Sequence, residues 1–366
     1  MGEGRGIPEP LAPCPLCETS LWEFMAAQPN LLPIIQTEAP DVAQPQLVGI
    51  ARLAAQGEHL DDGYNVEYLT IPVRSLLNKC TAPRMPFTWT INPYRGCEFA
   101  CKYCYARYTH EFMELRDSFD FEKKIFAKQQ AGWLLRRDLK RVKPGEEIAI
   151  GTATDPYQPA ERKFEITRGI MEELAQHSGF EIGVVTKSTL VLRDIDVLRA
   201  IAERNKLYIN ITVTTLDTQL ARILEPRAPR PDLRLEAVRT LNDAGVPAGV
   251  ICAPVVPGIT DSDEQLETLV AAVAKAGGQY IYANALFLKP CSAAVFMPFI
   301  EKEFPHLAAQ YRRRYGTNAF AEAGYRKRLS QTMARLRRKY GIVDRSEAAD
   351  SAHDPARGEE QLALFL

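Results

Sequence analysis

The chain reads Asn92-Pro-Tyr-Arg-Gly-Cys97-Glu-Phe-Ala-Cys101-Lys-Tyr-Cys104-Tyr105 immediately after an apolar, strand-like run that begins at Phe87. Its three cysteines are separated by three and two residues on a loop that follows a strand, so they can wrap one inorganic cluster. Iron–sulfur clusters ordinarily take four Cys ligands. Because no fourth Cys follows nearby, one iron is expected to stay open for a substrate, as in catalytic rather than structural metal sites.

Apolar, β-branched runs alternate with amphipathic stretches from Phe87 onwards. The predicted strands are Phe87–Asn92, Glu147–Gly151, Glu181–Thr186, Leu207–Val213, Ala248–Ala253 and Tyr280–Phe287. The predicted helices are Glu122–Arg141, Ile166–His177, Ile195–Arg204, Leu233–Ala244 and Asp263–Ala276. This alternation indicates right-handed crossovers and a parallel sheet. Six strands are too few for a closed eight-stranded barrel, so we expect an α/β fold, a partial (β/α)6 TIM-like barrel with its site at the carboxyl ends of the strands. A doubly wound open sheet is the alternative.

Composition changes along the chain predict four regions. Residues 1–85 are rich in Pro and Gln and are expected to form an irregular leader, with a short helix at Gln46–Gln56 and a strand at Val66–Pro72. Residues 86–290 form the predicted barrel. Residues 291–342 are expected to form a helical, basic extension, and residues 343–366 an acidic, disordered tail that ends in Gln361-Leu-Ala-Leu-Phe-Leu366.

The overall composition is that of an ordinary globular protein, with 46% hydrophobic residues, 25% charged residues and a net charge of −1. No apolar run reaches the roughly 20 residues that span a bilayer, and residues 1–13 lack the apolar core of a secretory signal. We therefore expect no membrane partner and a cytoplasmic location. Five of the eight cysteines lie in two tight groups, which is typical of metal binding rather than of disulfides.

The cysteine motif resembles that of the radical SAM superfamily, whose hallmark is C-x3-C-x2-C with an aromatic residue just before the last Cys, here Tyr103. The resemblance extends from about Phe87 to Pro290. It implies a [4Fe–4S] cluster held by Cys97, Cys101 and Cys104, with S-adenosylmethionine (SAM) bound at the open iron. It also implies an external electron donor, since an electron from the cluster cleaves SAM to a 5′-deoxyadenosyl radical.

Within that superfamily the chain is most similar to the spore photoproduct lyase-like (DNA repair photolyase-like) group. The matching residues are the run Asn92–Cys97, the pair Cys104-Tyr105, the run Gly151-Thr-Ala-Thr-Asp-Pro-Tyr-Gln158 and Thr186-Lys187-Ser188. The resemblance implies that Lys187 holds the SAM carboxylate and that Tyr103 and Tyr105 relay hydrogen atoms. It further places the remaining SAM contacts at Tyr103, Thr152, Thr154, Thr212 and Thr214.

One departure concerns the hydrogen donor, because the lyase carries a Cys on its second strand and Gly151–Asp155 contains none. Cys252 and Cys291 are the spatial substitutes to consider, although each is also explained as a small buried hydrophobe. Lys187 is equally explained as a surface charge, and Thr212 and Thr214 as β-formers. The resemblance therefore supports radical chemistry, with DNA repair or modification as the expected reaction class.

Two rival functions remain open at this point. One is a radical SAM enzyme that acts on a small molecule or peptide. The other is a nucleic-acid-binding module without catalysis, in which Cys97, Cys101 and Cys104 join His110 in a Cys3His zinc site. The pair Cys14 and Cys17 is a further metal or redox candidate, although a non-catalytic role is favoured because no partner pair follows it.

Two segments near the C-terminus predict macromolecular partners. Between Tyr311 and Tyr340 there are ten Lys or Arg residues against one acid, Glu322, so the stretch Arg312–Lys339 is expected to track nucleic-acid phosphates. The interleaved tyrosines, which are Tyr311, Tyr315, Tyr325 and Tyr340, are expected to stack on bases. The alternative is a solvated helix face. The terminal Gln361–Phe365 resembles the peptide by which bacterial repair and replication enzymes dock on the sliding clamp.

Overall fold

A computed structural model describes residues 47–81 and 85–343 of the chain. The fold described below is that of the described residues from Val48 onwards, which belong to one compact unit. Cys14, Cys17 and the terminal Gln361–Leu366 lie outside the described residues. Within the described ranges, no helix is both long and apolar enough to cross a membrane.

The main sheet has seven strands in the order β11-β10-β9-β8-β7-β4-β3. Their bounds are β3 Leu77–Lys79, β4 Trp89–Ile91, β7 Glu147–Ile150, β8 Glu181–Thr186, β9 Lys206–Thr212, β10 Ala248–Val255 and β11 Ile281–Ala285. The strands from β4 to β11 are all parallel and follow one another in chain order, whereas β3 adds antiparallel to β4. A doubly wound sheet would reverse its strand order at a switch point. The predicted partial barrel is therefore confirmed.

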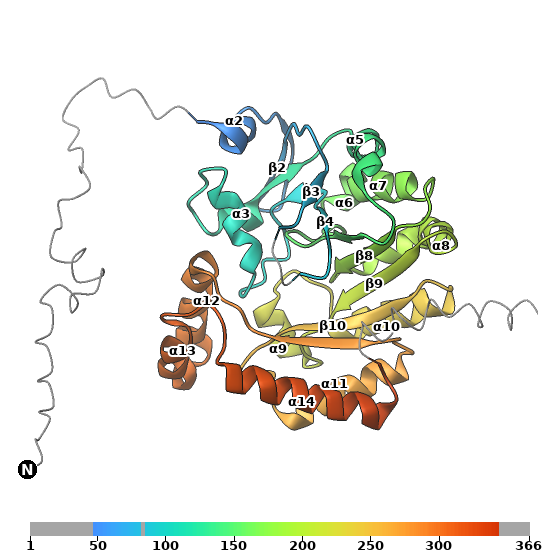
Figure 1. The fold of residues 1–366 in the computed structure, drawn as a ribbon. Coiled ribbons are helices and arrows are strands. Elements are labelled where there is room, and N and C mark those ends of the chain that lie inside the picture. The colour runs from blue at the N-terminus through green and yellow to red at the C-terminus, as the bar shows by residue number, and fades with distance from the viewer. Residues whose placement is uncertain (1–46, 82–84, 344–366) are drawn as a thin grey trace, which may run out of the picture. The chain divides into compact units, whose positions relative to one another are not determined.

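Helices between the parallel strands cover one face of this sheet (Figure 1). They are α5 Ala131–Asp138, α6 Glu161–Phe164, α7 Ile166–Leu174, α8 Ile195–Ala202, α9 Thr218–Leu224, α10 Pro231–Asp243 and α11 Asp263–Lys275, with 3-10 turns at η2 Leu139–Arg141 and η3 Thr189–Asp194. All four residues of β7 and six of the seven residues of β9 are buried. Strands covered on both faces need apolar residues on both, which explains their continuous apolar sequence.

A smaller sheet, with the order β1-β2-β6-β5, stands beside the first strand of the barrel. Its strands are β1 His59–Gly63, β2 Val66–Thr70, β5 Tyr94–Arg95 and β6 Lys124–Ala127, and the helices near it are α2 Gly49–Ala55, α3 Tyr108–Glu111 and α4 Asp120–Lys123, with η1 at Tyr105–Arg107. Residues 47–81 of the predicted irregular leader thus form regular elements. The helix predicted over Glu122–Arg141 is wrong at β6, because Ile125, Phe126 and Ala127 are buried and the strand pairs in parallel with β2.

The C-terminal helices are α12 Pro290–Glu303, α13 Ala308–Tyr315 and α14 Ala323–Tyr340, with η4 at Pro305–Leu307. Figure 1 shows α14 running beside α11 under the last strand of the barrel. Leu329, Met333 and Leu336 of α14 are buried in the main core. After α14 the chain returns to the sheet, where Val343 forms a parallel bridge with Tyr280. The helix therefore completes the barrel's last outer layer.

Candidate functional site

The cysteine loop connects β5 with η1, and its path depends on a glycine. Gly96 has φ +82°, and a Cβ there would stand 2.7 Å from the carbonyl oxygen of Lys124 and 2.8 Å from that of Phe121. Only glycine fits both the backbone conformation and the close approach. The next residue, Cys97, donates its backbone N–H to the Phe121 carbonyl at 2.9 Å. This contact fixes where the first cysteine of the motif lies.

The three thiols of Cys97, Cys101 and Cys104 lie close to one another in one apolar cluster. Burial raises the pKa of each thiol: to about 12 for Cys101 and well above the usual value for Cys97. Metal binding must therefore release protons from these thiols. In residues 47–81 and 85–343 no three His, Cys, Asp or Glu side chains gather closely enough to hold a single metal ion. A four-iron cluster spans more space than one ion, and a set of three thiol donors suits a cluster with one open iron.

The zinc alternative needed His110 as the fourth ligand, and the structure contradicts this. His110 is buried between Phe121 and Phe126, with ring centroids 5.2 and 5.9 Å away, and its Nε2 lies 3.0 Å from the Lys124 carbonyl oxygen. Burial lowers the pKa of His110 to about 4. The residue packs as a neutral part of the core, so the described residues form no Cys3His site.

Buried side chains from the loop after β7 form hydrogen bonds with the N-terminal end of the cysteine loop, at Gly96 and Glu98. Thr154 Oγ1 donates to the Gly96 carbonyl at 2.6 Å, and Gln158 Nε2 donates to the same oxygen at 3.2 Å. The Glu98 backbone N–H donates in return to Gln158 Oε1 at 3.0 Å. The Thr154 hydroxyl, predicted to contact SAM, is therefore engaged in orienting the loop.

Two further hydrogen bonds, to partners from distant parts of the chain, hold the C-terminal half of the loop at Lys102 and Cys104. The Lys102 backbone N–H donates to the Leu224 carbonyl at the end of α9, at 2.9 Å. Ser292 in the first turn of α12 is fully buried, and its hydroxyl donates to the Cys104 carbonyl at 3.0 Å. The loop is thus fixed by elements spread over most of the barrel.

Polar side chains link the carboxyl ends of the first three parallel strands, which is the edge where the site is expected. Asn92, which follows β4, accepts the Ala153 N–H at 2.7 Å and donates to the Thr152 hydroxyl at 3.3 Å. Asp155 accepts from the Thr186 hydroxyl at 2.6 Å and from the Lys187 backbone N–H at 2.7 Å. Burial raises the pKa of Asp155 above its usual value despite these bonds. Its role as a strand-end link was not assigned from sequence.

A buried polar network lies behind Cys101 and Tyr103. Glu225 accepts hydrogen bonds from the hydroxyls of Tyr103 and Thr214, the latter at 3.1 Å, and forms an ion pair with Arg234 at 2.5 Å. Glu225 and Arg234 are each 1% exposed. Burial disfavours the charged carboxylate, but attraction to Arg234 outweighs it and lowers the pKa of Glu225. Neither residue was identified from sequence, because each lies on a helix or turn outside any motif.

Lys187 joins this network at the end of β8. Its Nζ stands 5.6 Å from the centroid of the Tyr103 ring. Burial disfavours the ammonium, but attraction to Cys101 and Glu225 prevails and raises the pKa of Lys187. The side chain is therefore a cation at the cysteine loop rather than a solvated surface charge.

The other predicted site residues differ in how far their side chains are exposed to solvent. Tyr105 is 42% exposed, and its hydroxyl donates to the Thr152 carbonyl. Thr212 is 3% exposed, and its carbonyl accepts from Arg234 at 3.0 Å. Cys252 is fully buried, 4.0 Å from the Thr214 carbonyl, and Cys291 is 7% exposed beside Ser292. Tyr105 is thus the most accessible of these side chains.

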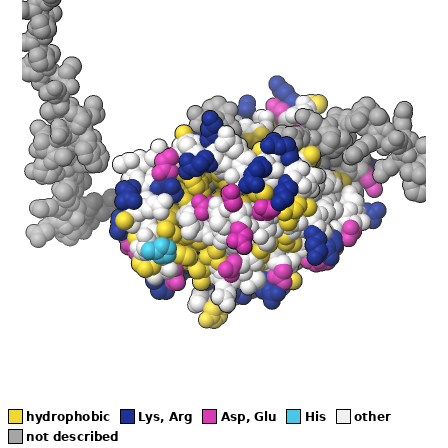
Figure 2. Space-filling model, turned by 90° about the horizontal axis from the view of Figure 1, so that it is seen from below, with side chains coloured by type: hydrophobic (Ala, Val, Ile, Leu, Met, Phe, Trp, Pro, Cys, Tyr) yellow, Lys and Arg dark blue, Asp and Glu magenta, His cyan; other side chains and the backbone are white. Residues whose placement is uncertain are grey.

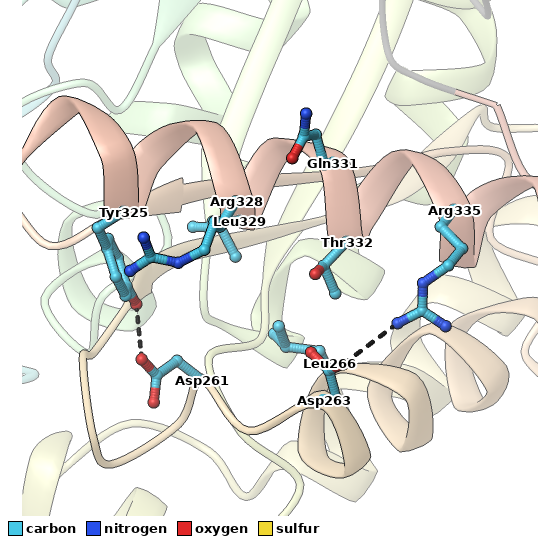
Figure 3. Close-up of a pocket in the computed structure, with 9 residues that line it drawn as sticks. All are labelled: Asp261, Asp263, Leu266, Tyr325, Arg328, Leu329, Gln331, Thr332 and Arg335. Atoms are coloured by element: carbon cyan, nitrogen blue, oxygen red, sulfur yellow. Dashed lines mark hydrogen bonds and ion pairs between the residues drawn. The ribbon is translucent and has the colours of Figure 1, made fainter.

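The basic stretch Arg312–Lys339 is partly neutralised by nearby acids. Figure 2 shows Lys and Arg side chains interspersed with Asp and Glu on the face seen from below, where α11 and α14 lie. Arg314 pairs with Glu322 at 2.8 Å, Arg335 with Asp263 at 3.4 Å, and Lys339 with Glu267. In the groove between α11 and α14 the Tyr325 hydroxyl donates to Asp261 at 2.9 Å (Figure 3).

The tyrosines of this stretch contribute mainly to packing. Tyr311 and Tyr315 are 1% and 8% exposed, and their hydroxyls donate to the carbonyls of Pro257 and Leu286. The expectation that these two rings stack on bases is therefore wrong. Tyr340 donates to Glu267 at 2.9 Å and remains partly exposed.

Comparison with known proteins places this arrangement in context. A family model described as the radical SAM superfamily matches residues 91–270. An uncharacterised protein of Mycobacterium tuberculosis is 32% identical over 345 residues, which cover 94% of this chain and 97% of that protein. An uncharacterised protein of Methanocaldococcus jannaschii is 25% identical over 240 residues, covering 66% of this chain and 85% of its own length.

Solved structures of spore photoproduct lyase share the fold. The lyase complexed with dinucleoside spore photoproduct has a TM-score of 0.59 and 17% identity, over 75% of this chain and 79% of that one. A mutant lyase with bound AdoMet and dinucleoside spore photoproduct has a TM-score of 0.57 and 17% identity, over the same shares. At 17% identity this similarity shows a shared fold and no more.

Proposed function

Because this chain belongs to the radical SAM superfamily, we propose that its three motif cysteines hold the [4Fe–4S] cluster at which it cleaves SAM. The superfamily uses this cluster and SAM as cofactors. One observation carries the proposal: Cys97, Cys101 and Cys104 share one apolar cluster on a loop that is held by hydrogen bonds, next to the carboxyl ends of the parallel strands. When bound, the cluster supplies the electron that splits SAM into methionine and a 5′-deoxyadenosyl radical.

The chain's own residues then bind and orient SAM. Lys187 is a cation beside Cys101, which suits the SAM carboxylate. Its position is stabilised by Glu225 and by the ring of Tyr103. Thr152 is held by Asn92 at the end of the neighbouring strand, so its backbone and hydroxyl are preorganised for a polar ligand. Tyr105, at the accessible end of the same loop, is our candidate for passing a hydrogen atom towards the substrate.

The substrate class that we propose is a nucleic acid, with repair or modification as the reaction. Support comes from the motifs shared with the spore photoproduct lyase-like group and from the common architecture with lyases solved with a dinucleoside lesion. Arg313 and Lys327 are exposed cations of the basic stretch that form no ion pair with an acid among the described residues, so they are available for phosphate contacts. Docking on a sliding clamp through Gln361–Phe365 belongs to the same proposal.

The deciding experiment is anaerobic reconstitution with iron and sulfide, followed by dithionite reduction with SAM. We expect brown protein that releases 5′-deoxyadenosine, and loss of both colour and product in Cys101→Ala. The matched control is Cys80→Ala, which removes a thiol from outside the motif and should leave both intact. Colourless protein that leaves SAM uncleaved after reconstitution would contradict the proposal.

The remaining rival is a radical SAM enzyme for a small molecule or peptide. Binding of single- and double-stranded oligonucleotides at several salt concentrations separates the two. Affinity that falls steeply with salt supports a nucleic-acid substrate, because each neutralised phosphate releases counterions. Active enzyme with no measurable oligonucleotide affinity at low salt would favour the rival.

A further inference from the structure

Two cations lie on the same face of the β5–β6 pair, next to the cysteine loop. Arg95 of β5 stands opposite Phe126 of β6. Lys128 follows β6 and donates its backbone N–H to the Pro93 carbonyl at 3.2 Å. Because alternate residues of a strand share a face, Lys128 lies on the side of Phe126 and is a diagonal neighbour of Arg95.

These cations are buried without a counter-charge. Lys128 is 3% exposed, and Arg95 is partly buried, with an Nε that is inaccessible and lacks a hydrogen-bond partner. In the described parts of the chain neither side chain makes an ion pair or a hydrogen bond. Other buried cations do have partners: Arg107 pairs with Glu122 at 2.6 Å, and Arg234 pairs with Glu225 at 2.5 Å. Unpaired burial of a cation is costly, so the contrast points to an external anion.

The state of Lys128 agrees with this reading. Burial, and then repulsion from Arg95, lowers the pKa of Lys128 to about 7. A lysine side chain with so low a pKa is readily deprotonated, and an anion that binds beside it favours the protonated ammonium. The ligand-free site therefore lacks a negative charge beside the two cations, and an anionic ligand would supply it.

The surroundings connect this pair to the mouth of the barrel. The phenol of Tyr108 interacts electrostatically with Arg95. The Nζ of Lys289 lies over the ring of Tyr108, 3.6 Å from its centroid. Lys289 precedes α12, the helix whose Ser292 holds the Cys104 carbonyl. Lys289 is thus a third cation, in contact with Tyr108 and at the start of the helix that contacts the cysteine loop.

We propose that Arg95 and Lys128 bind a phosphate group of the substrate. The guanidinium offers two parallel N–H donors that match phosphate oxygens, and the ammonium adds a point charge. The phosphate can come from the phosphodiester backbone of a nucleic acid or from a mononucleotide. The inference rests on the proposed function for the ligand's role as substrate, but the binding itself is measured independently of SAM cleavage.

The test uses the anaerobically reconstituted full-length enzyme and three probes: a short fluorescent oligonucleotide, thymidine monophosphate and inorganic phosphate. In Lys128→Met we expect affinity to fall about 10-fold or more, which is the range for losing a hydrogen bond to a charged group. The matched control is Lys140→Met, at an exposed lysine without a described acidic partner, and it should bind like the wild type. Arg95→Gln should weaken the same probes as Lys128→Met.

The pattern across probes identifies the source. Loss confined to the oligonucleotide indicates a phosphodiester, and loss of thymidine monophosphate and inorganic phosphate indicates a free phosphate compound; both support the site. The proposal is overturned if Lys128→Met has the wild-type affinity for each probe that the wild type binds. It is also overturned if the wild type binds none of the three probes.

Thermal melting guards against a folding artefact. Since Lys128 has no partner, Lys128→Met should melt at the wild-type temperature or above it. The preferred probe should raise the melting temperature of the wild type and not that of the variant. An equal rise in both proteins contradicts the site. Release of 5′-deoxyadenosine by the wild type is scored separately, so the proposed function and this site fail independently.

Discussion

The buried pair of Glu225 and Arg234 provides the sharpest stability test of this site. Glu225→Gln keeps the shape of the side chain but removes the charge that Arg234 and the Tyr103 and Thr214 hydroxyls contact. Because both partners of the pair are 1% exposed, the substitution leaves a buried guanidinium without compensation. Breaking such a pair from one side costs about 3–5 kcal/mol. We expect Glu225→Gln to be strongly destabilising.

The expected change in melting temperature follows from the size of the folded unit. An unfolding entropy of about 2.1 cal/mol/K per residue over roughly 300 residues converts 3–5 kcal/mol into a drop of about 5–8 °C. The control is Asp232→Asn in α10, because the Asp232 and Arg230 side chains of that pair are 50% and 61% exposed. Exposed pairs contribute about 1 kcal/mol or less, so the control should shift the melting temperature by no more than about 2 °C.

The pH dependence of this difference is also defined. The pKa of Glu225 lies below its usual value of 4.5, so its stabilisation is present above that value and is lost as the pH falls through the lower folded-state pKa. Differential scanning calorimetry of wild type and variant should therefore show a constant gap near neutral pH that narrows once the pH falls below the usual value of 4.5. Combining Glu225→Gln with Arg234→Met should cost less than the two single changes together. A Glu225→Gln protein that melts like Asp232→Asn would refute the reasoning.

Four further outcomes are expected. Gly96→Ala, whose Cβ would stand 2.7 Å from the Lys124 carbonyl oxygen, should bind less iron and sulfide per chain than Gly145→Ala, which has the same positive φ but no atom within 4 Å. Lys187→Met should weaken SAM binding about 10-fold or more in equilibrium dialysis of reconstituted protein, without changing its iron content. Oligonucleotide affinity should fall as the pH rises above about 7, because Lys128 loses its proton, while nearby His110 and Tyr108 keep their charge states with pKa values lowered to about 4 and raised above 10. Deleting Gln361–Leu366 should abolish pulldown of a bacterial sliding clamp, and retained pulldown would remove that partner from the proposal.

The parallel barrel and its family could be predicted because their signals are local. Each barrel strand is a continuous apolar run followed by an amphipathic helix, and the cysteine motif directly follows the first of them. Spacing and the apolar pattern therefore identify the cysteine loop, the parallel strands and a site at their carboxyl ends. The superfamily resemblance drawn from that motif is confirmed by the family model.

The parts that were missed depend on contacts between distant residues. The segment Lys124–Ala127 has a helical neighbourhood in sequence, but it becomes a strand because β2, more than fifty residues earlier, offers a parallel partner. Glu225 and Arg234 resemble ordinary surface charges until the fold buries them together. Arg95 lies inside the quoted motif, so its presence was visible, but the lack of a carboxylate near it is a property of the folded chain alone.

The anchoring of the cysteine loop has a consequence for the order of events during biosynthesis. The loop is complete at residue 104, yet its backbone partners are supplied by Phe121, Gln158, Leu224 and finally Ser292. A ribosome delivers these partners in that order, so the nascent chain presents its three thiols long before anything holds them in place. We expect the metal to be installed after α12 has emerged, as a late step of maturation, rather than while the first strands are still being made.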